Sequence, residues 1–290
     1  MRGWVGTGAL ALGVALITVN FAGFFVPITE HPVAARVHVH KNLSRPSYPA
    51  ALQALSRIDT RLPAEQFIAM ANQIVAARIV HHWPEPNEAD PDTMHSFLEN
   101  WYLAALQRAE AWLAKKGLAK VSIARGGRRD FRTILAKGVG LCDTTAIALV
   151  DFLQEKGIRA QILALGGHVV AYASVGDRNY IIDPDYAIII QDVPAPPERS
   201  IAKILAAYRE TGRPPDTLAR LESIYATSPM KTYEIKRYQR NWKRLLDGSR
   251  IIKWAVPIVL LALGIVLWRR SPDHPRALPQ GPDRASGRAA

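Results

Sequence analysis

Two long apolar stretches near the ends of this chain restrict its fold more than any other feature. Residues 5–26 contain only Asn20 and two threonines as polar interruptions. Residues 251–268 contain a single charge, at Lys253. A helix of about 20 residues crosses a hydrocarbon core of about 30 Å. The sequence therefore predicts a transmembrane anchor over residues 1–26 and a transmembrane helix over residues 251–268.

The first apolar stretch has a second interpretation, a cleaved signal peptide that starts with the charge of Arg2. Its apolar run is longer than that of most signal peptides and no small-x-small cleavage site follows it, so an uncleaved anchor is favoured. Arg2 also favours a cytoplasmic N-terminus, which places residues 27–250 outside the cytoplasm, in a periplasmic location. The basic residues ahead of the second span favour the opposite orientation, but this charge rule weakens for long translocated loops.

The charge of the chain favours an anionic partner. Its 290 residues carry a formal net charge of +12, which suits a membrane lipid surface. No nucleic-acid-binding signature is present, so we expect no nucleic-acid partner. Residues 196–250 are predicted to form a helical juxtamembrane region, because Tyr233, Tyr238 and Trp242 lie among basic residues ahead of the second span. Residues 269–290 are rich in Pro, Gly, Arg and Ala and are predicted to be a disordered tail.

Residues 27–120 are predicted to form a helical region. One helix follows Pro63, with apolar residues at helical spacing: Phe67, Met70, Ala71, Ile74 and Val75. A second helix is predicted from near Asp92 to Gly117. It places four residues on or near one face, which we expect to be buried in the core: Phe97, Trp101, Ala105 and Trp112.

The only cysteine, Cys142, precedes a helical pattern that ends at Gly157, a residue suited to the positive φ of a helix C-terminus. A helix N-terminus favours a thiolate and lowers the thiol pKa. Gly138 and Gly140 are expected to leave open backbone in front of the sulfur. The alternative interpretation is that Cys142 is a small buried apolar residue, as free cysteines often are.

Three predicted strands follow this helix, and the second begins with His168 while the third carries Asp183. A thiol nucleophile needs a base, and the base needs a carboxylate or amide to orient it. A hairpin turn centred on residues 175–176 pairs His168 with Asp183, whereas a turn centred on residues 177–178 pairs it with Ala187. Asp183 and Asp185 share a face in either register, so Asp185 is held in reserve as the third residue.

This part of the chain resembles the core of the transglutaminase-like superfamily, relatives of the papain fold. The resemblance covers residues 138–187 and consists of four motifs in order: Gly140-Leu141-Cys142, Gly157-Ile158-Arg159-Ala160, His168 and Ile182-Asp183-Pro184. It implies an α+β fold in which a helix packs on an antiparallel sheet, with residues 121–195 as the catalytic core. It also implies that Cys142 is the nucleophile, His168 the general base and acid, and Asp183 the residue that orients the imidazole. The Cys142 backbone N–H is expected to be one oxyanion donor, and the sequence identifies no second.

The resemblance implies acyl transfer or hydrolysis at amide bonds of a protein or peptide substrate. A peptidase or amidase is favoured over a cross-linking transferase, because hydrolysis needs only water as acceptor. The alternative function is a non-catalytic assembly or scaffold module of a cell-envelope or polysaccharide-export system, with an unidentified envelope partner. No cofactor and no metal are predicted. The remaining histidine candidates match no standard zinc spacing and are expected at a surface or interface: His38, His40, His81 and His82.

Overall fold

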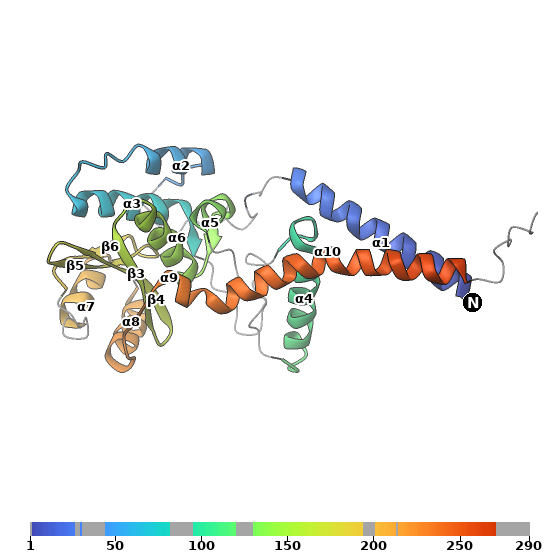
Figure 1. Cartoon of the computed structure of the whole chain (residues 1–290). Helices are drawn as coiled ribbons and strands as arrows, with labels where there is room; N and C mark the ends of the chain where they lie inside the picture. Colours follow the sequence, from blue (N-terminus) through green and yellow to red (C-terminus); the bar gives the residue numbers. More distant parts are fainter. Residues whose placement is uncertain are drawn as a thin grey trace, which may run out of the picture.

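The chain has a mixed α+β fold with an antiparallel sheet, as a computed structural model of all 290 residues shows (Figure 1). The structure describes residues 2–26, 30, 44–81, 95–119, 130–193, 201–212 and 214–270. The helices are α1 (Arg2–Phe25), α2 (Tyr48–Ser56), α3 (Ala64–Arg78), α4 (Phe97–Lys115), α5 (Phe131–Lys137), α6 (Cys142–Glu155), α7 (Ile201–Arg209), α8 (Pro215–Thr227), α9 (Ile235–Tyr238) and α10 (Arg240–Arg269). The strands are β1 (Val80–His81), β2 (Val139–Gly140), β3 (Arg159–Leu165), β4 (His168–Val175), β5 (Arg178–Asp183), β6 (Ile188–Ile190) and β7 (Lys231–Tyr233).

The central sheet has five strands in the order β6-β5-β4-β3-β7, and all neighbours are antiparallel. Val175 pairs with Arg178, so the turn between β4 and β5 consists of residues 176–177. Both registers expected from the sequence are therefore wrong. A tight two-residue turn satisfies the hairpin geometry, because Gly176 adopts a positive φ of 56°.

Alternating side chains of the sheet face two different apolar cores. Ile162, Ala171 and Ile182 point to the core formed with α2, α3, α5 and α6. Leu163, Val170 and Ile181 point to a second core, formed with α7 and α8 on the opposite side. Because successive side chains of a strand point to opposite faces, both faces of this sheet are apolar and both are covered by helices. Residues on these strands can thus reach either layer.

The helix α6 begins and ends where the sequence predicts. Leu141 is its N-cap residue and Cys142 its first residue. At the other end Gly157 has a φ of 77°, and the Ile158 N–H donates to the Leu153 carbonyl in a Schellman arrangement. Ten of its residues are buried, so its position relative to the sheet is closely defined: Cys142, Thr144, Thr145, Ala146, Ile147, Ala148, Leu149, Val150, Phe152 and Leu153.

Two helices are long and apolar enough to cross a membrane, namely α1 and α10. They lie side by side and extend away from the sheet and its covering helices (Figure 1). Small residues allow close approach, since a Cβ on Gly264 would lie 2.9 Å from the Gly6 carbonyl oxygen. The α10 helix is continuous from Arg240, so the end of the predicted juxtamembrane region and the second apolar stretch form one helix.

The helix α4 contradicts the expected core face. Phe97 and Trp112 are 48% and 60% exposed, and Ala105 is exposed as well. The buried residues of α4 lie elsewhere on the helix: Asn100, Leu103, Ala104, Gln107 and Ala114. The physical reason is its location, because α4 packs against α1 and α10 rather than against the sheet. A non-helical backbone at Asn100 also breaks the helical phase on which that prediction depended.

A short parallel pairing ties the first half of the chain to the start of α6. Val80 pairs with Val139, and His81 pairs with Gly140. The buried Arg78 guanidinium supports this pairing by donating to the Leu135 and Ala136 carbonyls at 2.8 and 3.1 Å. These carbonyls belong to the last turn of α5, where intrahelical donors are lacking. His81 therefore lies beside Gly140, which precedes Cys142 by two residues.

Candidate active site

The sulfur of Cys142 lies at the first residue of α6, in a tightly packed environment. Gly138 and Gly140, which were expected to leave open backbone here, are both buried. Gly138 ends α5 with a φ of 69°. A Cβ on Gly140 would lie 2.7 Å from the Thr144 Cβ. That expectation is therefore wrong, because these glycines allow a left-handed helix end and a close approach of two segments.

His168 lies at the start of β4 and is bound to Asp183 at the end of β5. Its Nε2 atom is 2.6 Å from the Asp183 Oδ2 atom. The Tyr208 hydroxyl, from α7, donates to the same oxygen at 2.5 Å and is 3.0 Å from the Tyr225 hydroxyl of α8. The Asp185 N–H donates to Asp183 Oδ1 at 2.9 Å. Asp183 is thus a fully bonded acceptor that fixes one edge of the imidazole ring.

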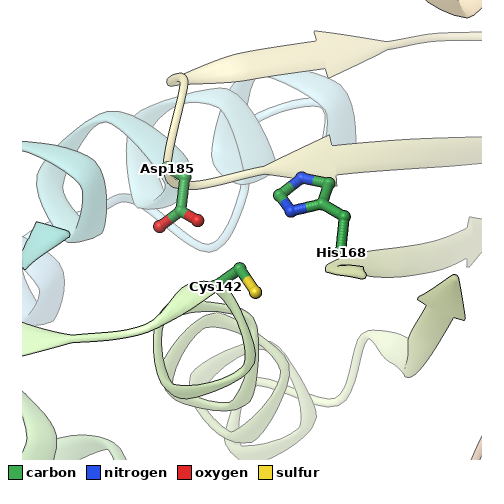
Figure 2. Close-up of side chains that lie close together, drawn as sticks. All are labelled: Cys142, His168 and Asp185. Carbon is green, nitrogen blue, oxygen red and sulfur yellow. The ribbon is translucent and has the colours of Figure 1, made fainter. Parts of the chain in front are cut away.

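Three side chains from separate elements converge beside this ring (Figure 2). Cys142 comes from the start of α6, His168 from β4 and Asp185 from the turn after β5. One ligand atom from each of the three lies within 4.8 Å of the others, and all three residues are buried. Since Nε2 of His168 is bound to Asp183, its Nδ1 is the ring nitrogen available to Cys142. The chain therefore contains a buried Cys-His-Asp group.

The pKa of the Cys142 thiol is raised, in contrast to the lowered pKa expected from its place at a helix N-terminus. Burial is the largest cause, because it disfavours the thiolate. The hydrogen bond and charge of His168 act in the opposite direction, and the charge of Asp185 raises the pKa further. The sequence-based expectation is therefore wrong: desolvation outweighs the effects that favour ionisation.

The imidazole has the opposite balance. Burial by itself would lower the pKa of His168. The charge and hydrogen bond of Asp183, together with the interaction with Cys142, instead raise that pKa well above its ordinary value. Burial and the neighbouring Asp183 charge also raise the pKa of Tyr208 well above its usual range, so this hydroxyl remains a donor at neutral pH. The carboxylate side of the site thus favours a protonated imidazole.

A second histidine–carboxylate pair lies next to the first. The His81 Nδ1 atom is 2.8 Å from Asp185 Oδ2, and the Thr145 hydroxyl donates to Asp185 Oδ1 at 2.8 Å. His81 was expected at a surface or interface, and this is wrong, since its side chain is only 22% exposed. Burial lowers the pKa of His81, but the Asp185 charge outweighs it and raises the pKa overall.

Sequence reasoning missed His81, Thr145, Tyr208 and Tyr225 as residues of this site. Thr145 is three residues beyond Cys142, so helical spacing places both on adjacent turns of α6. The sequence contains no comparable signal for His81, because only the β1–β2 pairing places it here. The two tyrosines lie in α7 and α8, between β6 and β7, and no motif marks them. His38, His40, His82 and the tail from residue 271 lie outside the described residues.

A cleft of about 370 Å³ opens onto His168 and Asp185 of this group, and the buried Cys142 is not among its lining residues. One side of it is formed by His81, His168, Asp185 and neighbouring Gly167 and Tyr186. The other side is formed by Pro214, which precedes α8, and by Thr217, Arg220, Leu221 and Ile224 of that helix. A solute in this cleft can contact the imidazole and both polar and apolar side chains. Such mixed lining is typical of sites that bind small molecules or short peptide segments.

Comparison with known proteins gives no family model that matches this chain, and no curated protein and no solved structure matches it.

Proposed function

We propose that this chain is a membrane-anchored, transglutaminase-like cysteine enzyme that acts on amide bonds of a protein or peptide substrate. The observation that carries the proposal is the position of His168 between Cys142 and Asp183. One ring nitrogen is 2.6 Å from the carboxylate, and the other faces the sulfur side. Nucleophile, base and orienting group in this order are the arrangement that covalent acyl transfer requires.

In the proposed reaction, the reactive form of the site has a neutral imidazole, and His168 Nδ1 takes the thiol proton as the Cys142 sulfur bonds to the substrate carbonyl carbon. The imidazolium then gives that proton to the leaving amine as the C–N bond breaks, which leaves a thioester. Water attacks the thioester, His168 takes its proton, and the thiol is restored as the acid product leaves. Asp183 holds the ring in position, and Tyr208 holds Asp183 through its hydroxyl. The Cys142 N–H is proposed to donate to the oxyanion.

Asp185 has a separate proposed role. Its charge lies close to both Cys142 and His168, where it favours the imidazolium and opposes the thiolate. His81 and Thr145 hold its two oxygens. We therefore assign Asp185 and His81 as positioning residues that set the charge balance of the pair. Asp183 remains the residue proposed to orient the ring.

The test is a reaction of the purified full chain with a mixture of peptide amides in water enriched in oxygen-18. Hydrolysis by any route incorporates one heavy oxygen in the product acid, so loss of this product in Cys142→Ala assigns the reaction to the sulfur. The same reaction with added lysine detects transfer to an amine, which releases no heavy-oxygen acid. We expect heavy-oxygen product from the native chain and none from Cys142→Ala.

Equal product from both chains would contradict the proposal. If neither the native chain nor Cys142→Ala gives product, and Cys142→Ala is fully active in a cellular assay, the non-catalytic assembly module is favoured. His168→Gln serves as a second variant, because it retains a polar side chain of similar size while removing the base. It is expected to lose turnover without losing the fold.

A second candidate function is metal binding, favoured by the close grouping of Cys142, His168 and Asp185. Thiolate, imidazole and carboxylate suit zinc, and metal-bound histidines commonly donate their other N–H to a carboxylate, as Asp183 would accept here. Metal analysis after purification, with and without a chelator, distinguishes the two. A stoichiometric metal that is lost together with the fold in chelator would favour this second function.

A further inference from the structure

The helix α4 occupies a distinctive place, at the end of the α1–α10 pair nearest the sheet. In Figure 1 it lies across α10 rather than along it. Its N-terminal half is attached there by specific contacts. The Lys253 ammonium donates to the Glu99 carbonyl at 3.2 Å, and the Trp101 indole N–H donates to the Lys253 carbonyl at 3.3 Å. The Asn100 amide donates to Ser249 at 2.7 Å.

The contacts lie at one level of the two apolar helices. Asn20 of α1 donates to the same Lys253 carbonyl at 2.7 Å. Aromatic rings gather beside it, with Phe21 and Phe24 centred 5.4 and 6.1 Å from Trp254. Tryptophan, polar side chains and a lysine at the end of an apolar helix are typical of a membrane–water boundary. This level is thus where α1 and α10 would leave a bilayer on the side of the sheet.

The exposed face of α4 combines bulky apolar side chains with a charged one, since Arg108 is exposed between Ala105 and Trp112. Trp101, Ala105 and Trp112 follow at intervals of four and seven residues, which places them on one face. Trp112 is 60% exposed, and Phe97 is 48% exposed at the start of the helix. Leu118, just beyond its end, is 72% exposed. The opposite face holds the buried side chains of Leu103 and Gln107.

The two long helices that α4 contacts also expose apolar side chains near their ends on the side of the sheet. Phe24 and Phe25 at the end of α1 are 69% and 84% exposed, and Ile251 in α10 is 70% exposed. Basic side chains accompany the face, since Lys115 and Lys116 are exposed at the end of α4. A helix with bulky apolar residues on one face and lysines near it suits the boundary between headgroups and acyl chains.

We propose that α4 lies in the plane of a bilayer surface, with Trp112 and Phe97 inserted at the headgroup level and its lysines at the phosphates. The occupant of this face is therefore a lipid surface rather than a second copy of the chain. This placement gives the sheet domain a fixed height above the membrane through Lys253 and Asn100. The inference does not depend on catalysis, because none of these residues lies in the candidate active site.

The single natural cysteine allows a direct test. The background is Cys142→Ala, into which one cysteine is introduced and spin-labelled: Trp112→Cys, Val14→Cys in α1, or Ser56→Cys in α2. Each full chain is reconstituted in vesicles of phosphatidylethanolamine and phosphatidylglycerol. Collision rates with oxygen, which concentrates in the bilayer, and with a water-soluble nickel chelate give the depth of each label.

We expect the Val14 label to lie deep in the bilayer and the Ser56 label to lie in water. The Trp112 label should lie about 5–10 Å below the headgroup boundary, the depth of interfacial helices. A Trp112 label as exposed to nickel as the Ser56 label would overturn the proposal. Spin–spin broadening at Trp112 with protection from both reagents would overturn it in favour of a second copy. A Val14 label in water would overturn both this inference and membrane insertion.

Discussion

At the scale of residues, the candidate site is governed by opposing electrostatic effects on one buried sulfur. Burial and Asp185 disfavour the Cys142 thiolate, whereas His168 favours it. His168 and Asp185 have different hydrogen-bond partners, because His168 is bound to Asp183 and Asp185 is bound to His81. Substitutions at Asp185 and His168 should therefore change the reactivity of the same thiol in opposite directions.

We predict that His168→Ala slows alkylation of Cys142 by iodoacetamide at neutral pH, whereas Asp185→Asn accelerates it. Each removes one charge that acts on the thiol, and a pKa change of one unit alters the thiolate fraction about tenfold. The measurement is the alkylation rate as a function of pH for the full chain in detergent. Unfolded chains serve as the control and should all react alike. Slower reaction in Asp185→Asn would instead identify Asp185 as the carboxylate that supports the base.

The raised pKa of His168 predicts a pH dependence of stability. A group whose pKa is higher in the folded state than in the unfolded state binds more protons when folded. Its stabilising contribution is complete below the unfolded histidine pKa, about 6.5. It is lost as the pH rises through the raised pKa of His168. The melting temperature of the detergent-solubilised chain should fall as the pH rises through that range. The fall should be less steep in His168→Gln. An identical slope in both chains would contradict the prediction.

At the scale of elements, short contacts between segments position the site more than long helices do. Gly140 is held between its strand partner His81 and the Thr144 side chain of α6. The β1–β2 pairing has only two residues in each strand. A small displacement there would move His81 and the start of α6 relative to each other.

We predict that Gly140→Ala destabilises the fold by about 1–3 kcal/mol, the usual cost of overpacking. Its new Cβ would lie 2.7 Å from both the Cβ and the Cγ2 of Thr144. Gly248→Ala is the matched control, because a Cβ there has no neighbour within 4 Å. The free energy of unfolding in denaturant would be measured for both. Equal stability of the two variants would show that β2 and the first turn of α6 can move apart at little cost.

At the scale of the whole molecule, α1 and α10 give the chain an elongated shape with the sheet domain at one end (Figure 1). Both are long and apolar enough to span a membrane. An antiparallel pair of this kind places the start of α1 and the end of α10 on one side and the sheet domain on the other. The expected orientation, with residues 27–250 outside the cytoplasm, remains a prediction.

We predict that a reporter that works only outside the cytoplasm is active when it is inserted in the exposed turn at Gly176. A second reporter that works only in the cytoplasm, at the same position, is the control. Gly176 is suitable because its turn projects from the β4–β5 hairpin and a Cβ there meets nothing within 4 Å. Activity of the cytoplasmic reporter alone would reverse the orientation and exclude a periplasmic substrate.

The sequence alone determined those features that depend on local pattern. Apolar length predicted α1 and the apolar part of α10, and helical periodicity with Gly157 predicted α6. Branched apolar runs between turn signals predicted the strands, and the family resemblance implied an α+β fold with an antiparallel sheet, which the structure confirms. The grouping of cysteine, histidine and aspartate followed from their order on a helix start and two successive strands, because such elements pack as neighbours.

Only the tertiary structure decided which groups surround the sulfur and how strongly it is buried. His81 reaches the site through pairing of segments 59 residues apart, Val80 with Val139. Tyr208 reaches Asp183 from a helix on the far face of the sheet. The thiol pKa is raised rather than lowered because desolvation depends on every neighbouring side chain, which no local pattern encodes. For the same reason the aromatic face of α4 could not be assigned from its spacing, since periodicity identifies an apolar face but not what covers it.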